Sequence, residues 1–271
     1  EVLAGVSILW KTTLGSEVVG APSLVRLSEE QTESAILIQD DQNQLYRLST
    51  GGEVVWRKQI EQPILSGIFG IDFYRNGRLY YLFNTSDAIW ILDDEGHEME
   101  GFPLQLQSPA TNSVLMVDFH NTREYSLFIA CENGNLYGFD QFGRPISGWN
   151  PQAGAGRVQF PLIHFKWDNK DYLAALSVKG KLSVFNRNGA QHFTPVSFNG
   201  TFNNCPPQFD DFSKSPRIVC MNTEGRVFVC NLQDDNTSRA QQLLQTLLAG
   251  FQPGAQSVQT IRREIPEADK T

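Results

Sequence analysis

The sequence lacks the features that mark a nucleic-acid-binding or membrane-spanning protein. No run of Lys and Arg is longer than Arg262-Arg263, and the net charge is −8 over 271 residues, so a phosphate backbone is not an expected partner. No apolar stretch approaches the roughly 18 residues that a bilayer-spanning helix needs. Charged residues are also scarce. At 19%, against 41% hydrophobic residues, they exclude a disordered polyelectrolyte and indicate a globular protein.

Cysteine is equally rare, with four residues in the chain and no CxxC pair. This excludes a disulfide scaffold of the kind found in small secreted domains. Cys131 and Cys220 lie inside apolar runs, so both are predicted to be buried free thiols that pack as small hydrophobic groups.

Because the sequence begins at Glu1, without a start Met or a signal segment, we expect it to be a processed or excised part of a protein.

The chain does contain an internal repeat. Five segments share an apolar residue, a second position that is often aromatic, and a polar turn that Gly closes in the first four. Their leading residues recur at steps of 44, 47, 46 and 45: Leu45, Ile89, Leu136, Leu182 and Val227. A second series, of aromatic residues, recurs at steps of 46, 46 and 47: Trp10, Trp56, Phe102 and Trp149. Two independent markers with one period indicate a repeated structural unit.

Each period predicts four short strands. Runs rich in Ile, Val, Leu, Phe and Tyr alternate with Asn, Asp and Gly, which is the pattern of strands joined by tight turns. Asn133-Gly134 is the strongest hairpin signal, since both residues readily adopt positive φ. We therefore predict an all-β fold, a β-propeller of four-stranded antiparallel blades with five recognisable repeats. The ring is either closed by pairing of the two ends of the chain or part of a larger ring.

The predicted propeller spans residues 1–250, and residues 251–271 form a tail or a ring-closing segment. Residues 1–13 are expected to be a fourth strand whose first three strands are missing. The five blades are expected at residues 22–60, 67–106, 113–152, 158–198 and 204–248. Blades diverge away from the axis, so we predict that the aromatic series lies buried on the fourth strands and fills the wedge between neighbouring blades.

A third periodic series consists of charged residues near the end of each first strand. Its members recur at steps of 46, 46, 48 and 45: Arg26, Asp72, Asp118, Lys166 and Asp211. We predict a ring of mixed charge that faces the axial channel. In the favoured interpretation the ring forms salt bridges between blades. Arg26 would pair with Asp72. Lys166 would pair with Asp118 or Asp211. The alternatives are a polar channel mouth that holds an ion or a ligand and, third, catalysis by the carboxylates.

No catalytic, cofactor-binding or metal-ligating residue is predicted. Asp93-Asp94-Glu95-Gly96 has the wrong spacing of oxygen ligands for a calcium loop and is interpreted as a turn. No G-x-S-x-G nucleophile motif occurs. The histidines have neither H-x-H nor H-x₃-H spacing, which argues against zinc: His97, His120, His164 and His192. We therefore expect no cofactor and no enzymatic activity.

The turn segments carry a family resemblance. Asp93–Pro103 and Asp140–Pro151 have the form D-x-x-G-x-x-x-x-G-[FW] and resemble segments of extracytoplasmic propellers with quinoprotein-like or integrin-like repeats. Leu48–Trp56 is similar to the T-G-x-x-x-W docking motif of the quinoprotein group, with a spacing altered by one residue. Residues 108–149 are similar to the propeller part of envelope-associated proteins of Bacteroidetes that have no assigned function. The resemblance implies a bacterial cell-envelope setting. Quinoprotein dehydrogenases typically use a vicinal Cys pair, which is absent here, so a quinone is not expected.

The expected function is that of a non-catalytic propeller of the cell envelope, in the periplasm or at the cell surface, that serves as a protein-interaction scaffold. Its partners would be proteins of unknown identity. The alternative is a ligand- or glycan-binding module that uses loop aromatics such as Phe142, Trp149 and Phe160. A glycosidase-like propeller enzyme comes third, since such enzymes need two or three carboxylates that converge on the axis.

Overall fold

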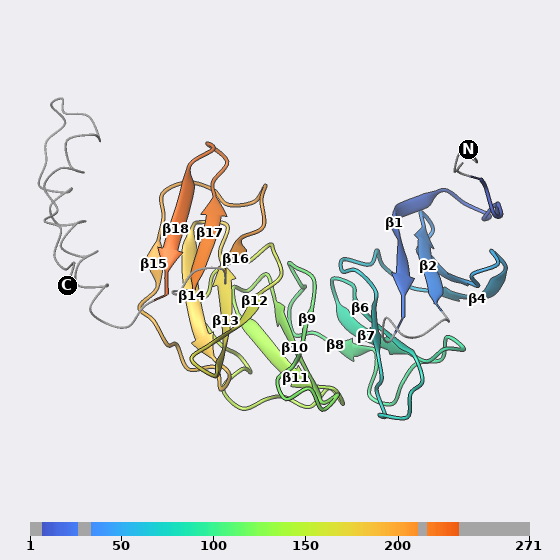
Figure 1. Ribbon diagram of the computed structural model, residues 1–271, viewed down its shortest axis with the longest axis horizontal. Helices are drawn as coiled ribbons and strands as arrows, with labels where there is room; N and C mark the ends of the chain where they lie inside the picture. The colour runs from blue at the N-terminus through green and yellow to red at the C-terminus, as the bar shows by residue number, and fades with distance from the viewer. Residues whose placement is uncertain (1–6, 27–33, 211–215, 233–271) are drawn as a thin grey trace, which may run out of the picture. The chain divides into compact units, whose positions relative to one another are not determined.

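The computed structural model describes residues 7–26, 34–210 and 216–232, and all secondary structure in this part is β-strand, without a helix (Figure 1). The chain divides into two compact units, residues 1–231 and 232–271. Every described strand belongs to the first unit. The predicted end of the propeller at residue 250 and the predicted tail at 251–271 lie outside the described residues.

Five antiparallel sheets follow one another along the chain, and the strands of each sheet pair in chain order. The first sheet contains β1 (Val18–Val25), β2 (Ala35–Asp40), β3 (Gln44–Leu48) and β4 (Val54–Gln59). The second contains β5 (Phe69–Ile71), β6 (Tyr80–Asn84), β7 (Ala88–Leu92) and β8 (Leu104–Gln105). The third contains β9 (Leu115–Asp118), β10 (Tyr125–Ala130) and β11 (Leu136–Asp140). The fourth contains β12 (Ile163–Trp167), β13 (Lys170–Leu176), β14 (Lys181–Asn186) and β15 (Val196–Ser197). The fifth contains β16 (Gln208–Asp210), β17 (Arg217–Met221) and β18 (Val227–Asn231).

Sheets that are neighbours in the chain pack face to face through apolar clusters. Tyr81 and Phe83 of β6 belong to a cluster with the first sheet, whereas Tyr80 and Leu82 belong to a cluster with the third. A further cluster joins the third and fourth sheets. Both faces of the second sheet are covered, so all residues of β6 and β7 are buried and the alternation of a half-exposed strand is lost. In the first and fifth sheets, β2 and β17 keep alternating burial.

The turn from the third to the fourth strand has the same construction in successive sheets. In the second sheet, Asp93 Oδ1 accepts hydrogen bonds from the backbone N–H groups of Glu95 and His97, at 2.9 and 2.8 Å. Gly96 closes this turn with φ = +86°, a conformation that side chains disfavour. The D-x-x-G pattern therefore encodes a turn that is capped by its own first side chain. The same pair of bonds forms in the third and fourth sheets at Asp140 and Asn186.

Tryptophan side chains contact the turns between the third and fourth strands of the first, second and fourth sheets. The indole N–H donates to the backbone oxygen of the second residue in the turn: Trp10 to Thr50 at 2.8 Å, Trp56 to Asp94 at 2.9 Å and Trp149 to Arg187 at 2.9 Å. The turn glycine also makes room for the ring, because a Cβ on Gly96 would lie 3.0 Å from Trp56 Cδ2. The tryptophans and the capped turns recur with one period because each tryptophan ring packs on a turn.

The aromatic residues occupy positions that differ in part from the prediction. Trp56 lies on β4, the fourth strand of its sheet, as predicted, but it is half-buried and not buried. Phe102 and Trp149 are buried but precede the fourth-strand position, in the turns that lead into it. Trp10 lies outside the described strands and is 37% exposed, so the prediction that it is buried is wrong. Its ring contacts the Thr50–Gly52 turn, and this contact leaves more than a third of the side chain open to solvent.

Replacing Trp149 by Ala is expected to lower the free energy of unfolding by about 3–5 kcal/mol, because a fully buried ring and its hydrogen bond are removed. Denaturant unfolding followed by circular dichroism measures this loss. Trp10→Ala is the matched control and should cost about 1 kcal/mol, since the Trp10 ring is partly exposed. Equal losses for the two variants would contradict this account of packing between sheets.

Thiol reactivity tests the burial of the cysteines. Cys131, Cys220 and Cys230 are buried and unbridged, which confirms the prediction for the first two, whereas Cys205 is partly exposed. Burial raises the pKa of Cys131 and Cys230 to about 12 and that of Cys220 to about 11. Only the thiolate reacts with disulfide reagents. At pH 8 such a reagent should therefore modify one thiol of the native protein rapidly, that of Cys205, and all four thiols of the unfolded protein. Cys205→Ser should remove the rapid reaction; a second rapid thiol would contradict the burial.

Candidate functional site

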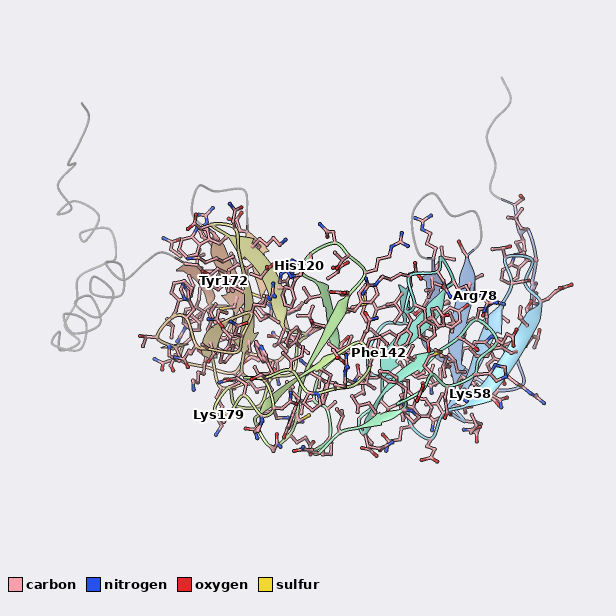
Figure 2. All side chains as sticks on the ribbon, turned by 90° about the horizontal axis from the view of Figure 1, so that it is seen from below. Lys58, Arg78, His120, Phe142, Tyr172 and Lys179 are labelled. Atoms are coloured by element: carbon pink, nitrogen blue, oxygen red, sulfur yellow. The ribbon has the colours of Figure 1, made fainter. Side chains whose placement is uncertain are left out.

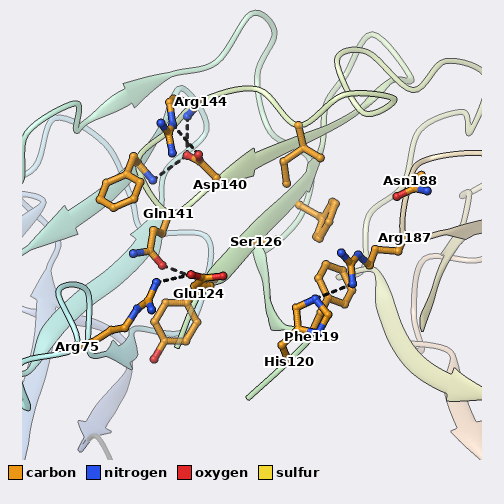
Figure 3. A pocket seen from close by; sticks show the side chains of 14 residues that line it. Arg75, Phe119, His120, Glu124, Ser126, Asp140, Gln141, Arg144, Arg187 and Asn188 are labelled. Atoms are coloured by element: carbon orange, nitrogen blue, oxygen red, sulfur yellow. Dashed lines mark hydrogen bonds and ion pairs between the residues drawn. The ribbon is translucent and has the colours of Figure 1, made fainter. Parts of the chain in front are cut away.

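A cleft of about 460 Å³ is formed by loops of the second, third and fourth sheets (Figure 3). In a sheet whose strands pair in chain order, the first loop and the third turn emerge at the same end, so loops that are distant in sequence meet there. The volume lies within the range of about 300–1,000 Å³ that is usual for ligand sites. The side chains that define the cleft are Arg75, Phe119, His120, Phe142, Arg144 and Arg187.

Two arginines of the cleft have carboxylate partners. Arg75 Nη2 lies 2.5 Å from Glu124 Oε1, and Arg144 Nε lies 2.7 Å from Asp140 Oδ2. The Arg144 guanidinium also lies over the ring of Phe142, 5.2 Å from its centroid. Such exposed pairs contribute little to stability, about 0–1 kcal/mol each. Their main effect is to orient the side chains of one wall.

The third arginine, Arg187, has a different environment. Its Nη1 donates to His120 Nε2 at 2.8 Å, so the geometry assigns the His120 proton to Nδ1. The guanidinium also lies 5.4 Å from the centroid of the Phe119 ring. Within the described ranges, no carboxylate lies at ion-pair distance from Arg187. Figure 3 shows Arg187, His120 and Phe119 on the side of the cleft opposite Arg75 and Arg144.

Buried polar contacts connect the second and third sheets at the wall of the cleft. Gln141 Nε2 donates to Phe73 O at 3.0 Å, and Gln141 Oε1 accepts the backbone N–H of Tyr125 at 3.0 Å. Burial raises the pKa of the Tyr125 hydroxyl, and its backbone hydrogen bond with Asp72 acts in the opposite direction. Because these polar groups have partners within the protein, they hold the wall in one arrangement.

The periodic aspartates at the ends of the first strands have a local role in the second and third sheets. Asp72 is buried and accepts the backbone N–H groups of Asn76 and Gly77, at 2.8 and 3.1 Å. Asp118 likewise accepts the backbone N–H of Arg123 at 2.7 Å. Each carboxylate thus closes the loop that leads to the second strand. Asp72 also forms an ion pair with Arg123, which links the two sheets.

Two of the salt bridges predicted for this charged series, Arg26 with Asp72 and Lys166 with Asp118, do not form among the described residues. Arg26 is exposed, and among the described residues it makes no ion pair with Asp72. Lys166 Nζ lies 3.9 Å from Asp171 of its own sheet, and among the same residues it is not paired with Asp118. The loops explain this outcome, since the carboxylates of Asp72 and Asp118 already accept hydrogen bonds from backbone N–H groups of the loops that follow them.

In the fourth sheet the equivalent loop is shorter. Asp168 and Asn169 form a two-residue turn with φ of +48° and +57°, as in the tight hairpins that such residues favour. Lys166 therefore stays on the paired strand β12, where it donates to Phe119 O of the third sheet at 3.3 Å. Asp211 lies outside the described residues. A ring of these five side chains around an axial channel stays a prediction.

The contact between His120 and Arg187 was not predicted from the sequence, because the two residues are 67 positions apart. A signal was present, since His120 lies in a first loop and Arg187 in a third turn, and these emerge at one end of their sheets. Of the loop aromatics expected to be available to a ligand, Phe142 lines the cleft and Phe160 is half-buried. Trp149 is not available, because it is fully buried between the third and fourth sheets.

The four histidines have separate neighbours. His97 lies beside Asp93, His164 beside Asp171 and His192 beside Tyr172. Over the described ranges, no group of three or more His, Cys, Asp or Glu side chains is arranged to hold a metal ion. Over the same ranges, no helix with the length and apolar character of a membrane span is found.

Comparison with known proteins identifies the fold. No protein-family model matches the sequence, and no curated protein matches it. The structure is similar to that of BamB from Moraxella catarrhalis, with a TM-score of 0.54 and 17% sequence identity over 83% of this chain. It is also similar to BBS1N in its complex with ARL6DN, with a TM-score of 0.54 and 12% identity over 80% of this chain. The chain spans 64% of the BamB chain and 67% of the BBS1N chain.

These likenesses and the five sheets establish the class of the protein. It is an all-β β-propeller of antiparallel sheets, as the repeats predicted. Within the residues that the structure describes, no strand pairing closes the ring, since every sheet is built from strands that are consecutive in the chain.

Asp72→Ala is expected to lower the free energy of unfolding by about 2–4 kcal/mol. The change leaves loop N–H groups without their acceptor and removes the partner of Arg123 from a buried position. Asp118→Ala is the matched control and should cost about 1 kcal/mol, because the bonds of Asp118 are exposed to solvent. Denaturant unfolding of both variants provides the measurement. A loss of unfolding free energy for Asp118→Ala as large as that for Asp72→Ala would show that burial of the carboxylate does not determine how much it stabilises the protein.

Proposed function

We propose that this chain is a non-catalytic β-propeller of the bacterial cell envelope that serves as a protein-interaction scaffold and binds its partner through the cleft of Figure 3. The observation that carries the proposal is the composition of the cleft. It combines three arginines with the exposed aromatic ring of Phe142. Arginine and aromatic side chains are the residue types enriched where protein interfaces concentrate their binding free energy.

The exposed ring of Phe142 is held in place before any partner arrives. It is 45% exposed, yet Phe73 meets it at an angle of 79° with 5.4 Å between centroids. The guanidinium of Arg144 lies on it as well. A side chain that is already ordered loses little conformational entropy on binding, so its contact area contributes more fully to affinity.

The proposed cell-envelope location is supported by similar solved structures and by the sequences of the turns. One similar structure, BamB, comes from the bacterium Moraxella catarrhalis, and the other is that of BBS1N in complex with ARL6DN. The capped turns resemble repeats of extracytoplasmic propellers, which supports a place in the periplasm or at the cell surface.

Binding of a small ligand or a glycan is the second candidate, and the volume of the cleft, about 460 Å³, favours it. A sugar-binding site uses open aromatic faces. Here one face of Phe142 is covered by Arg144, and Trp149 is fully buried. These contacts make a protein the better-supported occupant.

Affinity capture from an extract of the source cells, followed by quantitative mass spectrometry, tests the scaffold role. Phe142→Ala should reduce recovery of the specific partner at least tenfold, because it removes a central aromatic contact. Leu65→Ala is the matched control: Leu65 has the same 45% exposure but lies outside the cleft, and its replacement should leave recovery unchanged. Binding of the purified partner to both variants is then measured directly. A partner that binds wild type and Phe142→Ala equally would refute this role of the cleft.

A further inference from the structure

We propose that the Arg187 side of the cleft is a carboxylate-binding subsite, which takes an Asp or Glu side chain of a protein partner together with an adjacent apolar residue. The inference rests on the scaffold function proposed above and names the chemistry that the cleft recognises. Three observations carry it: the free donors of Arg187, the local charge of the cleft, and the apolar groups beside the guanidinium.

Arg187 is a fixed arginine with hydrogen-bonding capacity to spare. A guanidinium has five N–H donors, and one of them is directed to His120 Nε2. Unlike Arg75 and Arg144, it has no acidic partner in the described part of the chain. Its main chain is fixed by Trp149, whose indole N–H donates to Arg187 O at 2.9 Å.

Contacts on two sides restrict the guanidinium further. The Phe119 ring lies 5.4 Å from its central carbon, and the hydrogen bond with His120 sets its direction in the cleft. A guanidinium held in this way presents its remaining donors as a planar fork, which matches the two oxygens of a carboxylate. Because the Arg187 side chain is already ordered in the folded protein, binding of a carboxylate costs little additional conformational entropy.

The charge of the lining favours an anion at this place. The arginines Arg75, Arg144 and Arg187 give +3, and Glu124 and Asp140 give −2, so the lining carries +1 in a chain of net charge −8. An acidic partner is repelled by most of the chain and attracted at the cleft, which makes the contact specific in position.

The surroundings of Arg187 favour a peptide over an acidic glycan. Ile146 is half-buried and lines the cleft, and Phe142 lines its opposite wall. These apolar side chains suit a hydrophobic residue next to the carboxylate. A uronic acid would instead need hydroxyl partners and an open ring face for stacking. The face of Phe142 that Arg144 covers is not open in this way.

Isothermal titration calorimetry with defined probes tests the subsite. The probes are the blocked peptides acetyl-Leu-Glu-Leu-amide and acetyl-Leu-Gln-Leu-amide, and tri-galacturonic acid. The Glu peptide should bind about tenfold more tightly than the Gln peptide, since only the carboxylate accepts charge-assisted hydrogen bonds from Arg187. In parallel, the Nε–Hε signal of Arg187 in ¹H–¹⁵N spectra should shift with the Glu peptide. Absence of binding by the Glu peptide, equal binding of the two peptides, or tighter binding of tri-galacturonic acid would each overturn the proposal.

Substitutions localise the effect. Arg187→Gln should abolish the preference for the Glu peptide while the melting temperature stays unchanged, because the bond from Trp149 goes to the backbone oxygen. Arg157→Gln is the matched control. Arg157 is exposed and lies beside the β13–β14 turn, where Val178 N donates to Arg157 O at 2.8 Å. Lys179 of that turn and His120 lie on opposite sides of the unit (Figure 2). A loss of preference in Arg157→Gln as well would refute the assignment to Arg187.

The outcome is separable from that of the proposed function. If the Glu peptide fails to bind while a cellular partner still requires Phe142, the carboxylate subsite is refuted and the scaffold role stands. If the peptide binds through Arg187 but no protein partner depends on Phe142, the subsite stands and the scaffold role fails.

Discussion

The contact between a tryptophan and the capped turn of a neighbouring sheet, together with the apolar clusters between sheets, is the interaction on which the packing of the sheets depends. An indole N–H reaches the same backbone oxygen of the turn in three places, and at Gly96 the absence of a side chain makes room for the ring. Each sheet is too thin to bury its own apolar residues, so it must pack against a neighbour on each face. The tryptophan contacts and the apolar clusters therefore hold the first four sheets against their neighbours.

The same turns also build the cleft. Arg187 shows how one residue serves both purposes, since its backbone oxygen holds Trp149 while its side chain faces His120 and Phe119. Structural requirements act on the main chain of the turn and leave the side chain at its second position free to vary. In the equivalent turns this position holds Thr50 and Asp94. A propeller can thus keep its packing while the chemistry of its loop face changes.

Periodicity allowed much of the fold to be predicted but misassigned the roles of single residues. The spacing of Asp72 and Asp118 was real, and its cause is the capping of a loop by each carboxylate. The ion pair that forms joins Asp72 to Arg123, a residue outside the periodic series. A repeat reveals that a position has one role in every sheet. It does not reveal the partner, because the partner depends on loop length, as the two-residue turn at Asp168-Asn169 shows.

The all-β class, the sheet repeat, the Asp-to-Gly turns and the burial of Cys131 and Cys220 were predictable from the sequence, because each depends on residues that are close together in the chain or recur with its period. The exposure of Trp10 and the meeting of His120 with Arg187 were decided only by the tertiary structure. The physical reason is that these properties depend on which sheets stand side by side and how far each loop reaches between them. Distances of that kind are fixed by packing across sheets. The sequence indicates that a first loop and a third turn emerge at one end of their sheets, but not which of their side chains meet.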